Sequence, residues 1–153
     1  MTLYLLDTNV LIRAHEDYYP WAWLLEQGAA GRIKKPKLIF HEVTPPLGPL
    51  ADWIKQEDVK VGLILQEDPI GMGFVLGKGY APDLNDVEIE EIGKDPFLIA
   101  AALAAPDRVV VTKELSRPSR TRARRMAPDV CKYLGIEAID DYRLYKILKF
   151  SIP

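Results

Sequence analysis

The chain has 153 residues, of which 48% are hydrophobic and 27% are charged, and its formal net charge is -2 at pH 7. This length fits one domain with a sizeable core, and the composition excludes global disorder. No apolar run approaches the roughly 18 residues that a membrane span needs. The single cysteine, Cys131, excludes an internal disulfide and fits a reducing compartment. We therefore expect a cytoplasmic protein without a membrane partner, in which Cys131 has a packing role.

The first elements that the sequence predicts are a buried strand and a helix joined by a tight turn. Residues 3–6 (LYLL) are apolar, Asp7, Thr8 and Asn9 interrupt them, and apolar spacing resumes at Val10. Thr8 or Asn9 is placed to cap the helix. Asp7 then stands at the carboxyl end of a strand, where open α/β sheets bind ligands. The local sequence fits a simple turn or capping role for Asp7 equally well.

The next part of the chain is irregular. We expect a helix over residues 21–27 that the glycines at 28–31 end, followed by a basic turn over residues 32–37. Residues 38–40 fit either a short strand or the first turn of a helix. Three prolines within residues 45–49 exclude a regular helix there.

Residues 50–94 are harder to interpret. A helix is expected over residues 50–56, and residues 59–65 are ambiguous between strand and helix. Glycines and prolines recur through residues 66–94, which predicts a long loop or insertion of functional or mobile character. Residues 83–91 are acidic and are expected to be solvated.

Regular alternation returns near residue 95. Pro96 suits the first turn of a helix that Asp95 caps, and residues 97–105 (FLIAAALAA) are apolar nearly all round, which is typical of a buried helix. The sequence then predicts a strand ending at Thr112, with Lys113 and Glu114 just beyond it. A helix, a strand and a last helix are expected over 128–134, 136–139 and 142–148.

Strands that alternate with helices predict the α/β class, with a mostly parallel sheet and helices on both faces. We expect one domain over residues 1–153, with the insertion or loop at about 66–94. In such a sheet Asp7, Asp95 and Glu114 can meet at one edge. Clustered carboxylates repel unless a cation lies between them. Mg²⁺ and Mn²⁺ prefer oxygen ligands of this kind and support phosphodiester hydrolysis. His15 and His41 have no partner at metal-ligand spacing.

Three motifs in order, LLDTNVLI, DPFLIAAALA and VVVTKE, resemble those of PIN-domain ribonucleases. This family includes the toxin nucleases of bacterial and archaeal toxin–antitoxin pairs, and residues 128–136 resemble an uncharacterised PIN-like branch. The resemblance implies a PIN-like three-layer fold and a single-stranded RNA endonuclease that depends on Mg²⁺ or Mn²⁺, the toxin of such a pair. It leaves open an antitoxin protein and a second copy of the chain as partners.

The resemblance also assigns roles to residues. Asp7 is the first acid, Asp95 the third and Glu114 the fourth, and Asn9 and Thr112 support them. The family usually has a second acid on the helix after its second strand. The related branch is expected to carry it where Pro46 stands, so Glu42, one turn earlier, is the available substitute. The predicted catalytic residues are Asp7, Glu42, Asp95 and Glu114; Asp7, Asp95 and Glu114 are the predicted metal ligands.

A basic segment follows Glu114. Five arginines fall within residues 117–125, which contain no acid, on an otherwise acidic chain. Such an asymmetry indicates a polyanion partner, although a solvated surface is the common alternative. We expect a mobile loop at the start of the segment. The predicted RNA-binding residues are Lys113, Arg117, Arg120, Arg122, Arg124 and Arg125.

Two other interpretations stay open. The first is a catalytically degraded PIN-like domain that still binds RNA or protein, which the doubtful position of Glu42 suggests. The second is a phosphatase of the haloacid-dehalogenase type, with Asp7 as nucleophile and the Asp140–Asp141 pair as later acids. That class normally has an aspartate two positions after the nucleophile, where this chain has Asn9.

Overall fold

The protein is an α/β structure built on one five-stranded parallel sheet. The computed structural model describes residues 1–17, 20–43, 47–68 and 70–151. The strands follow the order β3-β2-β1-β4-β5 across the sheet. Their bounds are β1 Leu3–Leu6, β2 Ile33–Pro36, β3 Ile64–Leu65, β4 Arg108–Val111 and β5 Glu137–Ile139. The predicted fold class, a parallel sheet between two helical layers, is confirmed.

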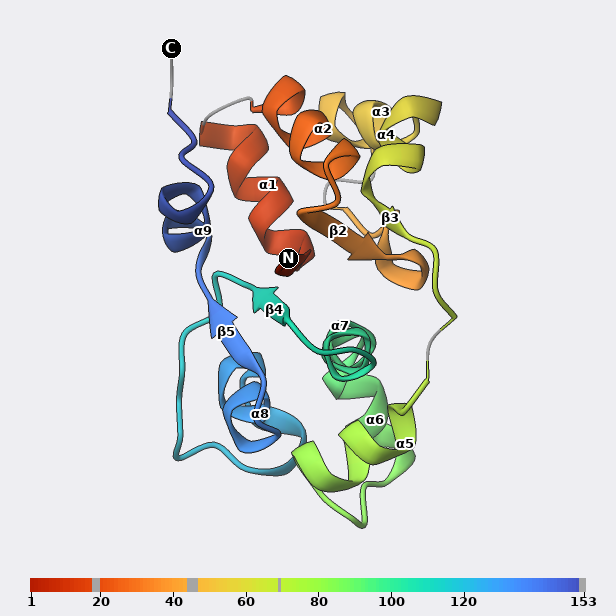
Figure 1. Ribbon diagram of the computed structural model, residues 1–153. Coiled ribbons are helices and arrows are strands. Elements are labelled where there is room, and N and C mark those ends of the chain that lie inside the picture. The colour runs from red at the N-terminus through yellow and green to blue at the C-terminus, as the bar shows by residue number, and fades with distance from the viewer. Residues whose placement is uncertain (18–19, 44–46, 69, 152–153) are drawn as a thin grey trace.

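Helices cover both faces of the sheet (Figure 1). One layer holds α1 Thr8–Asp17, α2 Trp21–Ala29, α3 Pro49–Ile54, α4 Glu57–Leu63 and α9 Asp141–Ile147. The other holds α5 Met72–Phe74, the π-helical turn η2 Val75–Tyr80, α6 Asp86–Ile92, α7 Asp95–Leu103 and α8 Ala127–Tyr133. Two short 3₁₀ turns, η1 Lys37–Ile39 and η3 Arg122–Arg124, lie in connections. In the described part of the chain no helix is long and apolar enough to cross a membrane.

Alternate residues of the strands face two separate cores. Leu6 and Val111 belong to the core under α1–α4 and α9, whereas Leu5 and Val110 belong to the core under α5–α8. All four side chains are at most 1% exposed. A strand buried on both faces needs apolar residues at every position, which explains the continuous apolar runs of β1 and β4. Cys131 is buried in the second core, as predicted.

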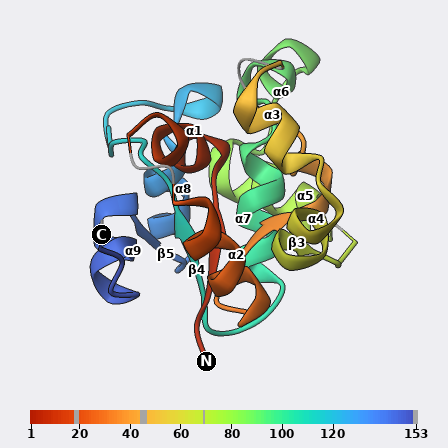
Figure 2. The ribbon, with the colours of Figure 1, turned by 90° about the horizontal axis from the view of Figure 1, so that it is seen from above.

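The strand order creates a switch point beside β1. From β1 the chain moves outward through β2 to β3, and then returns to β4 on the other side of β1. Leu6 pairs with Val111 at the carboxyl ends of these two central strands. Successive connections leave this point in opposite directions, so they open a crevice at the sheet edge where parallel α/β folds bind ligands. Figure 2 shows the N-terminus at one end of the molecule and α6 at the other.

The tertiary structure bears out one expectation for residues 21–37 and corrects another. Helix α2 ends at Ala29, within residues 28–31 as predicted, and Gly28 is its penultimate residue, where a Cβ would approach the Gly62 carbonyl oxygen to 2.7 Å. This glycine therefore permits close packing between α2 and α4. Residues 33–36 form β2 and not a basic turn. Strand pairing with β1 and β3 overrides the polar composition of this segment.

The prediction of a long loop or insertion at about 66–94 is also wrong. This stretch contains α5, η2 and α6, which close the second core with Val75, Tyr80 and Ile92. Helix α6 begins with a capping box between Asn85 and Glu88. Residues 59–65, which were ambiguous, divide between α4 and β3. The glycines in this stretch interrupt the apolar spacing by which helices are recognised in a sequence. The helices form because their apolar residues pack in the second core.

Candidate functional site

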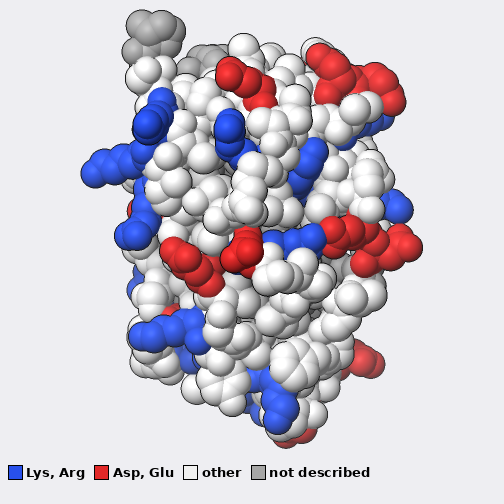
Figure 3. Space-filling model, in the orientation of Figure 1, with Lys and Arg blue, Asp and Glu red and all other residues white. Residues whose placement is uncertain are grey.

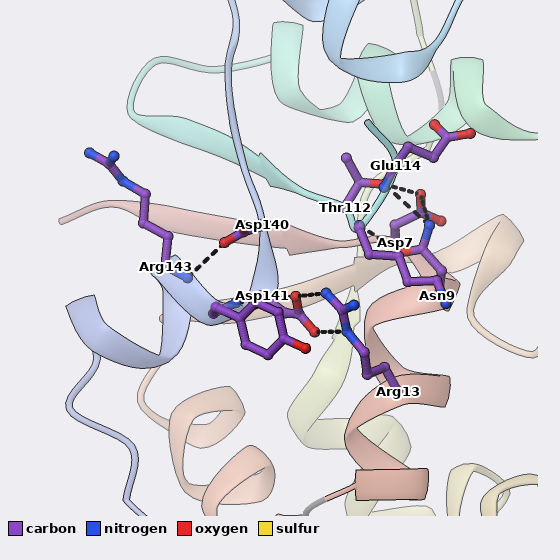
Figure 4. A network of polar contacts seen from close by, with 10 residues as sticks. Asp7, Asn9, Arg13, Thr112, Glu114, Asp140, Asp141 and Arg143 are labelled. Carbon is purple, nitrogen blue, oxygen red and sulfur yellow. Dashed lines mark hydrogen bonds and ion pairs between the residues drawn. The ribbon is translucent and has the colours of Figure 1, made fainter. Parts of the chain in front are cut away.

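Asp7 lies at the switch point, immediately after β1 and before α1. It is 9% exposed. The hydroxyl of Thr112 donates a hydrogen bond to Asp7 Oδ2 at 2.8 Å, and Asn9 Nδ2 donates to the same oxygen at 3.2 Å. Figure 4 shows these side chains gathered where β1 and β4 end. The Asp7 carboxylate is thus oriented by Thr112, which follows β4, and by Asn9 in the first turn of α1.

Asn9 connects two segments and does not cap the helix. Its Nδ2 also donates to Thr112 Oγ1 at 3.3 Å, and its Oδ1 accepts from the backbone N–H of Lys113 at 3.1 Å. Thr8 Oγ1 accepts a hydrogen bond from Lys35. The capping role predicted for Thr8 or Asn9 is therefore replaced by contacts to β4 and β2. The supporting roles predicted for Asn9 and Thr112 fit these contacts.

Asp95 is the first residue of α7 and not its cap, because Lys94 occupies the cap position. Burial, and then the charges of Asp7, Glu114 and Glu42, together raise the pKa of Asp95 to about 8. A carboxylate in this environment is costly to ionise without a nearby cation. The four predicted acids therefore share one electrostatic environment, although they come from distant parts of the chain.

Glu114 follows β4 by three residues and is partly buried. Burial raises its pKa, the backbone N–H of Ala127 opposes this shift, and Asp7 adds to it. That N–H donates to Glu114 Oε2 at 3.2 Å. Burial and then the charges of Asp95 and Glu114 also raise the pKa of Tyr80 and that of Cys131, the latter to about 12. Both side chains are therefore near the sheet edge that carries Asp7, Asp95 and Glu114, which we call the acidic edge.

Glu42 lies beyond η1 and its side chain is exposed. Its backbone N–H donates to the Ile39 carbonyl at 3.2 Å. The charge of Glu42 is the last of the causes that raise the pKa of Asp95. Among the other three acids, Glu42 therefore has the weakest effect on the pKa of Asp95. Pro46, where the family resemblance leads one to expect the second acid, lies outside the described residues.

Lys35 is a residue of this site that sequence analysis missed. It lies on β2 and is 1% exposed. Its Nζ donates to Thr8 Oγ1 at 2.8 Å and to the Ile39 carbonyl. Burial lowers the pKa of Lys35 to about 8, and the nearby charges of Asp7 and Glu42 oppose this shift. The polar segment Ile33-Lys34-Lys35-Pro36 gives no sequence signal for this role, and only its pairing as β2 with β1 and β3 places Lys35 inside the protein.

The donor set of the acidic edge fits a hard divalent cation. Carboxylate oxygens are the ligands that Mg²⁺ and Mn²⁺ prefer, and a cation would offset the repulsion that raises the pKa of Asp95. Among the described residues, however, no group of three or more acidic, histidine or cysteine side chains is arranged to hold an ion directly. Mg²⁺ typically binds through one or two carboxylates and keeps several waters. The structure thus fits a partly hydrated cation better than a closed protein cage.

An open cavity of about 330 Å³ adjoins the acids and receives part of the basic segment. Asp95 and Glu114 line it together with Arg120, Arg124 and Arg125. Arginines and carboxylates therefore face the same space. On the face seen in Figure 3, by contrast, basic and acidic side chains are interspersed without one large patch of either sign.

The remaining basic residues are arranged differently. Arg122 binds Glu88 at 2.8 Å and Asp83 at 2.7 Å, so its guanidinium is used within the protein. The backbone N–H of Arg117 donates to Asp129 at 2.7 Å, which anchors the start of the segment. Lys113 lines a separate cavity of about 230 Å³ with Glu114.

The Asp140–Asp141 pair has structural partners. Asp140 accepts a hydrogen bond from the backbone N–H of Arg143 at 2.8 Å and caps α9. Asp141 is fully buried and binds Arg13 through both carboxylate oxygens (Figure 4). The Arg13 guanidinium lies 4.4 Å from the Tyr142 ring centroid. These contacts attach α9 to α1.

Comparison with known proteins gives a family but no characterised relative. A family model described as a domain of unknown function (DUF4411) matches residues 4–152. No curated protein matches the chain. No solved structure matches it either.

Proposed function

The chain belongs to the DUF4411 family of domains of unknown function, and we propose that it is a divalent-metal-dependent endonuclease of single-stranded RNA. One observation carries this proposal. Asp7, Asp95 and Glu114 act on one another electrostatically at the switch point of a parallel sheet, and burial with these neighbours raises the pKa of Asp95 to about 8. Strongly perturbed carboxylates in a crevice are typical of functional sites.

The acids have distinct environments in the proposed site. Asp7 is oriented by Thr112 and Asn9 through Oδ2, so Oδ1 is the oxygen offered to a ligand. Asp95 and Glu114 line the adjoining cavity. A partly hydrated divalent cation bound at these acids, in part through its own waters, would supply an activated water and charge neutralisation at the phosphoryl oxygens. Glu42 would act through a water, consistent with its exposed position.

The chain's other residues bind and position the RNA. Arg120 and Arg124 line the acidic cavity and are exposed. Planar guanidinium groups suit phosphate oxygens because they donate two parallel hydrogen bonds. Lys35 fixes the Thr8 side chain next to Asp7 through its hydrogen bond. A role as the toxin of a toxin–antitoxin pair, with an antitoxin partner, stays a prediction from the resemblance, as does self-association.

A second candidate function is RNA binding without cleavage. It is favoured by the absence, among the residues that the structure describes, of a side-chain group arranged to hold an ion directly. A ligand that binds only the native state raises thermal stability. Stabilisation by Mn²⁺ in the wild-type chain, and its loss in Asp7→Asn, would therefore support the nuclease over the binding module.

The test is cleavage of an end-labelled single-stranded RNA with Mn²⁺ and with EDTA. We expect Asp7→Asn to lower the rate by about 100-fold or more, because each ~1.4 kcal/mol of lost charge stabilisation costs a factor of ten. Glu42→Gln should cause a smaller loss. Asp86→Asn is the matched control, an exposed acid at the first turn of α6. Cleavage that persists in Asp7→Asn, or that EDTA does not affect, would overturn the proposal.

A further inference from the structure

A second cavity, larger than the acidic one, adjoins the basic segment. Its volume is about 700 Å³, within the range of roughly 300–1,000 Å³ typical of ligand sites. Four side chains of α5, η2, α8 and the residue after η3 give it its character: Phe74, Lys78, Tyr133 and Arg125. We call these four residues the aromatic groove. Phe74 and Lys78 belong to the stretch 66–94 and Tyr133 to α8, and these three residues do not line the acidic cavity.

The aromatic rings of the groove are exposed. Phe74 is 54% and Tyr133 is 65% exposed, although both side chains are large and apolar. Arg125 is held beside them, because its guanidinium donates to the Gly79 carbonyl and lies 5.3 Å from the Tyr133 ring centroid. An exposed ring with a fixed guanidinium next to it offers a flat, cationic face for stacking.

The packing of η2 against α8 keeps the groove in place. A Cβ at Gly79 would approach Val130 Cγ1 to 2.7 Å, so this glycine allows the close contact of the two elements. Figure 1 shows α8 and the green segment that contains η2 in the same layer. Gly73 and Gly77 line the groove, and no atom lies within 4 Å of the position of a Cβ at either residue. At these two glycines the wall of the groove is therefore backbone that no side chain covers.

The charge of the groove selects its occupant. Its cationic side chains are Lys78 and Arg125, and none of its described lining residues is acidic. The chain as a whole carries a net charge of -2. Aromatic faces combined with cations in a groove are the features with which proteins bind single-stranded nucleic acid, whose bases stack and whose phosphates need positive charge.

The aromatic groove adjoins the acidic cavity. Tyr80 and Arg125 line both spaces. Tyr80 is 7% exposed and lies between the groove and the acids that raise its pKa. A strand with a phosphodiester at Asp95 and Glu114 would therefore pass Arg125 and enter the groove with its neighbouring nucleotides.

We propose that the aromatic groove is a stacking subsite for unpaired nucleotides of an RNA strand that flank the phosphodiester at the acidic edge. This inference rests on the proposed nuclease function, and it adds the requirement that the substrate has unstacked bases beside the cut. Phe74 and Tyr133 stack the bases, and Lys78 and Arg125 bind the intervening phosphates. Duplex RNA is excluded because its bases stay stacked on one another.

The test measures binding without metal, so that it does not depend on cleavage. The probe is a fluorescent single-stranded RNA of twelve nucleotides, compared with the same strand carrying abasic sites, and the readout is fluorescence anisotropy of the full chain. We expect Phe74→Ala and Tyr133→Ala each to weaken binding of the intact strand by about tenfold. Each variant should bind the abasic strand as the wild-type chain does, because the lost interaction involves the bases.

Two matched variants separate stacking from general effects. Tyr133→Phe keeps the ring and should bind as the wild-type chain does. Tyr142→Ala removes an equally cation-stacked tyrosine, 47% exposed, that belongs to α9 and does not line the groove. It should leave RNA binding unchanged. Gly77→Trp fills the open side of the groove and should weaken binding as the alanine variants do.

Several outcomes would overturn the inference. They are unchanged affinity in both alanine variants, an equal loss for intact and abasic strands, and a wild-type chain that does not bind the intact strand. A shift from dimer to monomer in Tyr133→Ala without a change in RNA affinity would make the groove a self-association surface. Base-dependent binding in a chain that never cleaves RNA would retain the subsite and reject the nuclease. If the chain cleaves RNA and the groove variants bind RNA as the wild-type chain does, the nuclease would be retained and the stacking subsite rejected.

Discussion

Asp95 combines two properties that oppose each other at neutral pH. It lines the acidic cavity, where a cation needs its ionised form, and its pKa of about 8 keeps it protonated in the metal-free protein. Burial is the first cause of this shift, and the charge of Asp7 is the second. Binding of a cation must therefore release a proton from the site, so metal affinity should increase as the pH rises toward 8.

The same shift predicts how the stability of the metal-free protein depends on pH. Asp95 ionises near 3.8 in the unfolded chain and near 8 in the folded one. Between these values the folded state binds more protons, so the free energy of unfolding falls as the pH rises, and the penalty is complete above about pH 8. Asp95→Asn carries no such penalty. In EDTA its melting temperature should match that of the wild-type chain near pH 4 and exceed it by several degrees at pH 8–9.

Thermal unfolding from pH 4 to 9 measures this difference, and Asp86→Asn is again the control. With Mn²⁺ the order should invert at high pH, because only the wild-type chain gains a ligand that binds the native state. Melting curves of the two proteins that run parallel across the whole pH range would show that Asp95 is not buried among the other acids.

At the scale of elements, the contact between α2 and α4 depends on two glycines with opposite surroundings. A Cβ at Gly28 would lie 2.6 Å from Leu63 Cδ2 and 2.7 Å from the Gly62 carbonyl oxygen. A Cβ at Gly62 would lie 3.8 Å from Leu25 Cδ2, which is ordinary contact. Gly28→Ala should therefore destabilise the fold by about 1–3 kcal/mol through overpacking. Gly62→Ala should stabilise it by up to about 1 kcal/mol, because alanine is the better helix former.

Urea unfolding of the two variants and the wild-type chain measures both effects. Since the substitutions share one interface, their opposite signs would identify close packing as the cause. Equal effects of the two alanines would mean that α2 and α4 approach less closely. Both helices also contact β2, the strand that carries Lys35 and pairs with β1.

At the scale of the whole molecule, the basic segment divides into arginines with different partners. Arg120 and Arg124 face the acidic cavity, whereas Arg122 binds Glu88 and Asp83. Arg120→Ala and Arg124→Ala should each weaken binding of single-stranded RNA and reduce the slope of log affinity against log salt by roughly 0.7. Arg122→Ala should leave this slope unchanged and instead increase hydrogen exchange in α6.

Fluorescence titrations of RNA at several salt concentrations test the first part, and hydrogen exchange tests the second. The cleavage pattern along a given RNA should not change in any of the three variants, because phosphate contacts do not select bases. Equal salt slopes in all three variants and the wild-type chain would return the segment to a solvated surface or a docking face for an acidic protein.

Local patterns predicted the elements whose cause is local. The apolar run of β1, the proline near the start of α7 and the β-branched run of β4 each indicate their structure within a few residues. Together they predicted the parallel sheet and the positions of Asp7, Asp95 and Glu114 at the termini of its elements. The arginine-rich character of residues 117–125 is likewise visible in the sequence.

Only the tertiary structure decided the features that depend on distant neighbours. Lys35 is buried because β2 pairs with both β1 and β3, and a side chain at Gly28 is excluded because α4 packs closely against α2 there. Arg122 binds Glu88 and Asp83, which are 34 and 39 residues away in the sequence, and its own neighbourhood does not reveal these partners. The groove between Phe74 and Tyr133 likewise joins α5 to α8. A sequence pattern records the local preference of each residue, whereas burial, pairing and pKa arise from charges and surfaces that folding brings together.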